Sequence, residues 1–119
     1  MSRKQGQQYE SIAADYLVKQ GLKLIASIYQ VYRGELDLVL LDQQVVVFTE
    51  VKYRKHSRFG SAAEMVNLKK QKHLAIAANT FLKIHPAYAN NACRFDVIAM
   101  SGDSDNLKID WIKNAFLIT

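Results

Sequence analysis

The spacing of apolar side chains along the chain predicts two helices and five strands. Over residues 5–20 the apolar positions recur every three or four residues, which is typical of an amphipathic helix. A longer stretch, residues 62–82, carries a second stripe of this kind, made of Val66, Lys70, His73, Leu74, Ala77, Ala78 and Phe81. Runs rich in β-branched and other apolar residues predict strands over 22–32, 36–41, 45–53, 93–100 and 107–112.

Glycine and proline mark where several of these elements end. Gly21 follows the first helix and is expected to terminate it, because glycine readily takes the left-handed conformation of that position. Pro86 cannot continue the second helix, so this helix is expected to close just before it. We expect a turn at Arg33–Gly34 and an irregular tail over 113–119.

The hairpin predicted over 36–53 is largely apolar on both of its faces. Leu36, Leu38 and Leu40 point to one side, while the residues between them include Val39 and Leu41 on the other. Such a pattern favours a sheet that is covered on both sides by helices. We therefore expect an α/β protein, a three-layer α/β/α arrangement with a mixed sheet of about five strands, in one domain over residues 1–119.

Composition and charge narrow the class of protein and of partner. Half of the residues are hydrophobic and 23% are charged, which indicates a globular chain. The net charge of +5 favours a polyanionic partner, above all nucleic acid, although many small proteins are basic without binding one. The single Cys93 cannot form an internal disulfide and is interpreted as a buried core thiol. The polar start of the chain and the lack of a long apolar run predict no signal peptide, no membrane partner and a cytoplasmic location.

Three charged residues interrupt the apolar hairpin. Glu50 and Lys52 are two positions apart on one strand and therefore point to the same side. If the hairpin turns at residues 42–45, Leu41 pairs with Val46, and Asp37 then falls opposite Glu50. Two carboxylates about 4 Å apart repel by roughly 4 kcal/mol at an effective dielectric constant near 20. A divalent cation would relieve this repulsion.

The same residues suit the hydrolysis of phosphodiester bonds. Asp37 and Glu50 would hold Mg²⁺ or Mn²⁺ together with the backbone carbonyl of Val51. A water bound to the metal would be the nucleophile, and Lys52 would orient it or stabilise developing negative charge. The alternative for Asp37 is an ordinary strand-end residue, and for Glu50 and Lys52 an ion pair on a solvated strand face. Glu35 fits a turn residue and a ligand role equally well.

A basic segment follows this hairpin directly. Arg54, Lys55 and Arg58 are predicted to contact the phosphates of a nucleic acid, because they come straight after the strand that carries Glu50 and Lys52. The alternative is a run of charges that only faces solvent. The chain has no phosphate-binding glycine-rich loop, no serine-hydrolase motif and no histidine or cysteine pair at zinc spacing, so those chemistries are not expected.

Several motifs together carry a resemblance to a known family. Asp37 followed by Glu50-x-Lys52 resembles the D…(D/E)-x-K signature of restriction-endonuclease-like nucleases. The bacterial YraN-like family, which is grouped by fold with archaeal Holliday-junction resolvases, is similar to this chain in Gly34–Leu38, Phe48–Arg54, Phe59–Gly60 and Arg94–Val97. The resemblance covers nearly the whole chain, from the first helix to Asn114-Ala115-Phe116.

This resemblance implies a metal-dependent nuclease site that acts on DNA or structured nucleic acid. It also implies that Glu10 of the first helix approaches the metal and that Lys70 reaches the site from the second helix. The alternatives are a solvated position at the border of the helix for Glu10 and a side chain that extends to solvent for Lys70. The chain departs from the family where an asparagine and an arginine usually precede the Gly-Glu-x-Asp segment, because Ile28 and Gln30 stand there.

We therefore expect a nucleic-acid phosphodiesterase of endonuclease type that depends on Mg²⁺ or Mn²⁺ and selects its substrate by structure, with DNA favoured over RNA. A symmetric cut of two strands needs two sites, so a homodimer or a partner protein is expected. Two alternatives stay open, namely a nucleic-acid-binding protein that keeps the fold without catalysis and a protein–protein adaptor.

Overall fold

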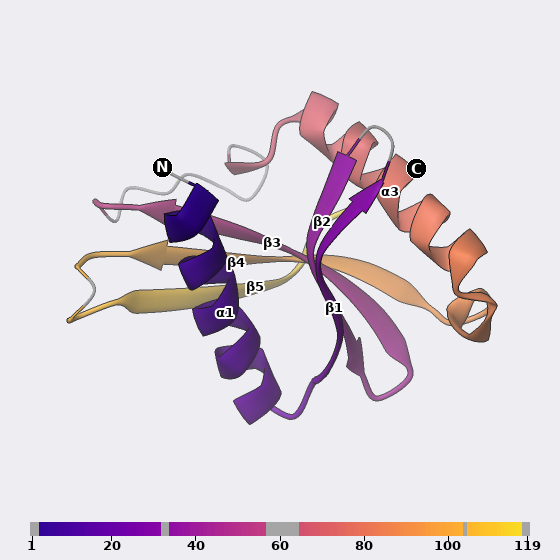
Figure 1. Ribbon diagram of the computed structural model, residues 1–119, viewed down its shortest axis with the longest axis horizontal. Helices are drawn as coiled ribbons and strands as arrows, with labels where there is room; N and C mark the ends of the chain where they lie inside the picture. Colours follow the sequence, from indigo (N-terminus) through magenta and orange to yellow (C-terminus); the bar gives the residue numbers. More distant parts are fainter. Residues whose placement is uncertain (1–2, 32–33, 57–64, 104, 118–119) are drawn as a thin grey trace.

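A computed structural model describes residues 3–31, 34–56, 65–103 and 105–117 of the chain (Figure 1). The order of helices and strands is the predicted one, apart from a short 3₁₀ helix between the second long helix and the fourth strand. The elements are α1 (Arg3–Lys19), β1 (Lys23–Val31), β2 (Gly34–Asp42), β3 (Val45–Arg54), α3 (Leu68–Ile84), η1 (Pro86–Tyr88), β4 (Cys93–Ser101) and β5 (Lys108–Phe116).

The five strands form one mixed sheet, which confirms the predicted α/β class. Their order in the sheet is the same as in the sequence, from β1 at one edge to β5 at the other. Neighbouring strands run antiparallel except β3 and β4, which run parallel. The chain between these two strands includes α3, as parallel neighbours require a crossover connection.

Each helix packs on the sheet through a core of its own. Ala13 and Leu17 of α1 belong to one buried cluster, and Leu74 and Phe81 of α3 belong to another. The two cores draw on alternating residues of β3: Val46 and Phe48 join the α3 cluster, whereas Val47 joins the α1 cluster. Both faces of the sheet are therefore buried, which is compatible with the predicted three layers.

The second helix begins later than its apolar spacing suggested. Its first residue is Leu68, and the side chain of Asn67 caps it by accepting a hydrogen bond from the backbone N–H of Lys70 at 2.8 Å. Val66 is buried but not helical, so its place in the predicted stripe was wrong. Residues 62–64 of the prediction lie outside the described residues.

Two other expectations are corrected. Cys93 is exposed, because it is the first residue of β4 and precedes the buried part of that strand. The predicted tail is partly strand, since β5 continues to Phe116. Asn114 lets it do so by taking a positive φ of 51°, and its backbone N–H donates to the Asp96 carboxylate at 2.9 Å. No helix in the described part of the chain has the length and apolar character needed to span a membrane.

Candidate metal and nucleic-acid site

The candidate site lies where β2 and β3 separate. The two strands pair from Asp42 and Val45 as far as Leu38 and Thr49, and Leu41 faces Val46 as the hairpin predicted. The next pair along this register would be Asp37 and Glu50. Figure 1 shows that beyond this point the start of β2 rises toward α3 while the end of β3 continues along β4. A fork in the sheet thus opens beside Asp37.

The side chain of Asp37 bridges this fork. Its Oδ2 atom accepts a hydrogen bond of 2.9 Å from the backbone N–H of Val51. This bond connects β2 to β3 beyond Leu38 and Thr49, which are the last pair in their register. The Asp37 carboxylate is therefore held in place by the main chain of β3, next to Glu50.

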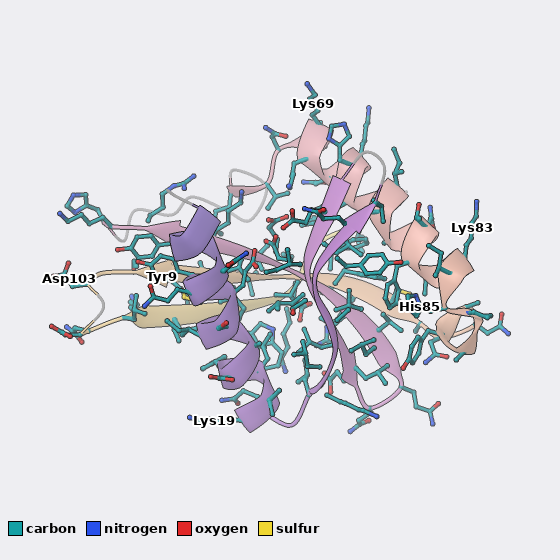
Figure 2. All side chains as sticks on the ribbon, viewed as in Figure 1. Tyr9, Lys19, Lys69, Lys83, His85 and Asp103 are labelled. Atoms are coloured by element: carbon teal, nitrogen blue, oxygen red, sulfur yellow. The ribbon has the colours of Figure 1, made fainter. Side chains whose placement is uncertain are left out.

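Helix α1 brings a further carboxylate to the fork. Ala13 and Leu17 are fully buried against the sheet, and the ring of Tyr9 stacks on that of Tyr53 of β3 with 4.1 Å between ring centroids. In Figure 2, Tyr9 extends from α1 beside the strands. These contacts fix the start of α1 over the sheet and so position Glu10, the residue after Tyr9.

Four acidic side chains meet here, and we call Glu10, Glu35, Asp37 and Glu50 the carboxylate cluster. Oxygen atoms of Glu10, Glu35 and Asp37 all lie within 4.8 Å of one another. Glu50 adjoins Asp37 on the β3 side of the fork, where the two carboxyl groups interact directly. The site thus combines residues from α1, β2 and β3.

Glu50 is the most buried member of the cluster. Its side chain is only 6% exposed, and its Oε2 atom has no hydrogen-bond partner among the described residues. The nearest cation is Lys70 of α3, whose Nζ lies 3.8 Å from this oxygen, beyond hydrogen-bond distance. Oε2 of Glu10 is likewise buried without a described partner.

Burial and crowding change the protonation of both glutamates. Burial, followed by the neighbouring Asp37, raises the pKa of Glu50 from an ordinary value of 4.5 to about 9, although the positive charges of Lys70 and Lys52 oppose this rise. Burial, followed by Asp37 and then Glu35, raises the pKa of Glu10 to about 7. At neutral pH the cluster therefore holds protons that a bound cation would displace.

The basic residues predicted at the site fall into two groups. Lys70 and Lys52 contribute positive charge to the cluster. Arg54 and Lys55 are exposed where β3 ends, and Arg54 donates to the backbone carbonyl of Tyr53 at 3.2 Å. Arg58 lies outside the described residues.

The structure places one residue whose role the sequence left open, Glu35, and adds one that the sequence did not single out, Gln71. Glu35 joins the cluster, and its position two residues before Asp37 on β2 is the same spacing that indicated Glu50 and Lys52. Gln71 is buried in α3 and donates to the carbonyl of Val66 at 2.9 Å, which ties the start of α3 to the preceding segment. Gln71 lies three positions before the buried Leu74 on the helix, and this spacing indicates that both side chains face the core.

Comparison with known proteins gives a consistent result over nearly the full chain. The model of a family described as uncharacterised protein family UPF0102 matches residues 9–100. A UPF0102 protein of Pseudomonas syringae pv. syringae is 49% identical over 112 residues, which cover 93% of this chain and 91% of the relative. A UPF0102 protein of Stutzerimonas stutzeri is 42% identical over 115 residues, which cover 97% of this chain and 96% of the relative. The matched residues include the whole carboxylate cluster.

Proposed function

We propose that this chain, which belongs to the uncharacterised protein family UPF0102, is a metal-dependent endonuclease that hydrolyses phosphodiester bonds in nucleic acid, with DNA favoured over RNA. The proposal rests on one observation: a buried oxygen of Glu50, without a hydrogen bond from the described residues, lies where acidic side chains from α1, β2 and β3 meet. Such an arrangement costs stability unless a cation neutralises it.

The residues of the cluster fit a hard divalent cation. Carboxylate oxygens are the ligands that Mg²⁺ and Mn²⁺ prefer, and two of them here, Oε2 of Glu10 and of Glu50, are buried without another partner among the described residues. Asp37, Glu50 and Glu10, with the carbonyl of Val51, would hold the ion, which when bound would supply positive charge at the phosphate and an activated water.

The protein itself would supply positioning and charge around the reacting phosphate. The hydrogen bond from Val51 holds the Asp37 carboxylate at the fork. Lys52 follows Glu50 on the same strand face, where its ammonium group can stabilise negative charge that develops on the phosphate oxygens. Lys70 opposes the charge of Glu50 from the α3 side.

Nucleic acid would be bound through its backbone phosphates. Arg54 and Lys55 are exposed directly beyond the strand that carries Glu50 and Lys52, and Lys70 lies on the α3 side of the fork. With a net charge of +5, the protein should bind polyanions in a salt-dependent manner. Because the described part of the chain holds one such cluster, cutting both strands symmetrically would require two copies of the chain.

Cleavage assays on a panel of substrates test this proposal. Branched, flapped, nicked, single-stranded and duplex DNA are incubated with the protein and Mn²⁺ or Mg²⁺, and products are resolved by gel electrophoresis. We expect cleavage that chelation abolishes. Glu50→Gln removes a ligand that would hold the metal, and Lys52→Ala removes a cation that stabilises negative charge in the transition state, so each should lower the rate by about 100-fold or more.

A matched variant controls for contaminating nucleases and for effects that any acid-to-amide substitution would have. Asp103→Asn also replaces an acid by its amide, but Asp103 is exposed in the loop between β4 and β5, at the far end of the sheet (Figure 2). It should cleave at the wild-type rate. Equal activity in Glu50→Gln and wild type would overturn the proposed site. Salt-dependent binding without turnover in either metal would instead indicate a nucleic-acid-binding protein, and no binding at low salt would favour an adaptor.

A further inference from the structure

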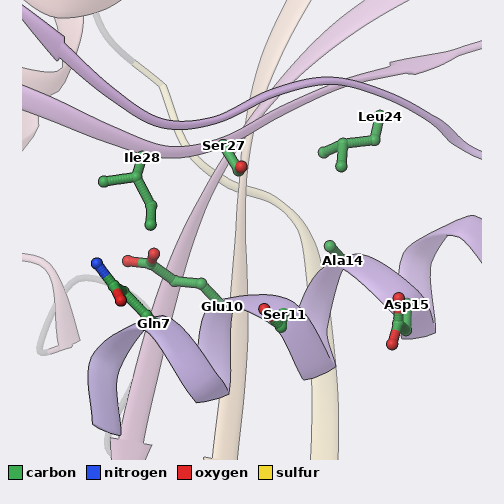
Figure 3. Close-up of a pocket in the computed structure, with 8 residues that line it drawn as sticks. All are labelled: Gln7, Glu10, Ser11, Ala14, Asp15, Leu24, Ser27 and Ile28. Atoms are coloured by element: carbon green, nitrogen blue, oxygen red, sulfur yellow. The ribbon is translucent and has the colours of Figure 1, made fainter. Parts of the chain in front are cut away.

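A groove adjoins the carboxylate cluster on the α1 side. It lies between residues 7–15 of α1 and residues 24–28 of β1, has a volume of about 350 Å³, and is open to solvent (Figure 3). We call it the α1–β1 groove. Glu10 belongs both to this groove and to the cluster, so a group seated in the groove would lie directly beside whatever the cluster holds.

The walls of the groove combine uncharged hydrogen-bonding groups with apolar surface. Gln7 offers an amide, and Ser11 and Ser27 offer hydroxyl groups from opposite walls. Leu24 and Ile28 supply apolar surface from β1. Amides and hydroxyls both donate and accept hydrogen bonds, so they suit a flat group with mixed donors and acceptors on its edge.

The charges in the groove exclude a phosphate as its occupant. Among the described residues that line it, the ionisable ones are Glu10 and Asp15, and both are acidic. Phosphates would therefore stay on the basic side, near Lys52, Arg54 and Lys70. A nucleobase, by contrast, is uncharged at neutral pH, has apolar faces, and carries donors and acceptors on its edges.

The backbone of β1 is distorted at the groove. Ile28 has a φ of 50°, which a β-branched residue rarely adopts, and it stands between the pairs Ser27–Leu38 and Tyr29–Leu36, opposite Asp37. Figure 3 shows its side chain over the groove near Glu10 and Gln7. Such strain is often retained next to ligand sites.

From these observations, and resting on the proposed function, we propose that the α1–β1 groove receives one unpaired nucleobase next to the phosphate held at the carboxylate cluster. A groove of this size is at the lower end of pockets that hold small ligands, so it admits a single base and not a base pair. A base in a duplex must first be unstacked and unpaired, which costs a few kcal/mol. The protein should therefore select single strands, flaps and frayed junctions.

Binding assays without metal test the groove separately from catalysis. Fluorescence anisotropy at low salt compares a labelled single-stranded oligonucleotide with the matching duplex, for wild type, Ser27→Phe and Ser27→Ala. Ser27 is exposed on an edge strand, so phenylalanine there should fill the groove without disturbing the core. We expect Ser27→Phe to weaken single-strand binding about tenfold and leave duplex binding unchanged, because the ring fills the space that one base would occupy. Ser27→Ala, which removes only one hydroxyl group and keeps the groove open, should weaken single-strand binding less than Ser27→Phe does.

A second measurement needs no variant at all. Wild-type protein is titrated with thymidine and with deoxyadenosine, which carry no phosphate, and backbone amide shifts are followed by NMR. The proposal predicts shifts grouped at Ser11, Ala14, Ser27 and Ile28. Scattered or absent shifts, or equal loss of single-strand and duplex binding in Ser27→Phe, would overturn it. Failure of the proposed function looks different, since Glu50→Gln would then leave cleavage intact whatever the groove binds.

Discussion

Two buried acids in this protein have opposite surroundings. Asp96 of β4 is fully buried, and both of its oxygens accept hydrogen bonds, from Arg94, from the indole N–H of Trp111 at 2.9 Å and from the backbone of Asn114. Glu50, on the neighbouring strand, is nearly as buried, yet its Oε2 atom has no described hydrogen-bond partner. One carboxylate is fully satisfied by the protein, and the other keeps an oxygen without a hydrogen bond from the described residues.

The difference separates a structural acid from a candidate functional one. Arg94 links Asp96 to Asp42 at the far end of β2 with a distance of 2.9 Å, so this network fastens β2, β4 and β5 together. Glu50 has neighbouring carboxylates instead, and the cations that act on it among the described residues are Lys70, 3.8 Å from Oε2, and Lys52. A buried charge without partners is costly, and proteins usually retain such a group where function requires it.

Removal of each acid should give the largest contrast. Asp96→Ala leaves Arg94 and Trp111 without their partner in the interior, so we expect the free energy of unfolding to fall by about 3–5 kcal/mol. Glu50→Gln replaces a carboxyl group that stays protonated at neutral pH by an amide of similar size, so it should cost less than about 1 kcal/mol, or stabilise. Urea unfolding followed by circular dichroism measures both. The exposed Asp110→Ala serves as a control within about 0.5 kcal/mol of wild type. Equal losses of unfolding free energy in Asp96→Ala and Glu50→Gln would contradict the difference proposed between the two acids.

The pH dependence of stability gives a second test of the difference between Glu50 and Asp96. The pKa of Glu50 rises from 4.5 to about 9 on folding, so the folded protein binds more protons than the unfolded chain between these values. The stabilisation present below pH 4.5 is therefore lost as pH rises toward 9. Glu10, with a pKa near 7, adds to the loss over the lower part of this range.

We expect a loss on the order of 2 kcal/mol in unfolding free energy between about pH 5 and about pH 8 in the presence of a chelator. Thermal unfolding at a series of pH values measures it. Glu50→Gln should flatten most of the slope, and Mn²⁺ should restore stability most strongly at high pH, where the carboxylates are free of protons. A wild-type slope in Glu50→Gln would show that Glu50 is not the group responsible.

A smaller effect concerns the backbone beside each acid. Asn114, next to Asp96, and Ile28, next to Asp37, both have positive φ values, of 51° and 50°. Asparagine tolerates this conformation, whereas a β-branched residue does so at a cost of about 1–2 kcal/mol. Ile28→Asn should stabilise the protein by about 1 kcal/mol, and Asn114→Ile should destabilise it by a similar amount. Loss of stability in Ile28→Asn would mean that the packing of the isoleucine outweighs its strain.

The sequence predicted the parts of this site that depend on local rules. Counting from the turn at residues 42–45 placed Leu41 against Val46 and brought Asp37 to Glu50, because antiparallel register follows from turn length. Alternation along a strand aligned Glu50 with Lys52. The approach of Glu10 and Lys70 came only from the resemblance to a family, since helical spacing says nothing about where a helix docks on a sheet.

What the sequence could not predict depends on contacts between distant segments. Asp96 accepts hydrogen bonds from Trp111 and Asn114 of another strand, and no local pattern predicts that these residues come together. The exposure of Cys93 depends on where β4 enters the sheet, and an apolar neighbourhood in the sequence suggested the opposite. The fork beside Asp37 likewise arises from the divergence of β2 and β3, which neither strand shows alone.

Binding of Mn²⁺ to the wild-type protein is the most direct test of the proposed metal site at the fork. Isothermal titration calorimetry at neutral pH, repeated in two buffers of different ionisation enthalpy, gives the affinity, the stoichiometry and the number of protons released. We expect one Mn²⁺ per chain, with release of protons from Glu10 and Glu50, and an affinity at least about tenfold weaker in Asp37→Asn. No binding to wild type, or equal affinity in Asp37→Asn, would contradict the existence of a metal site at the fork.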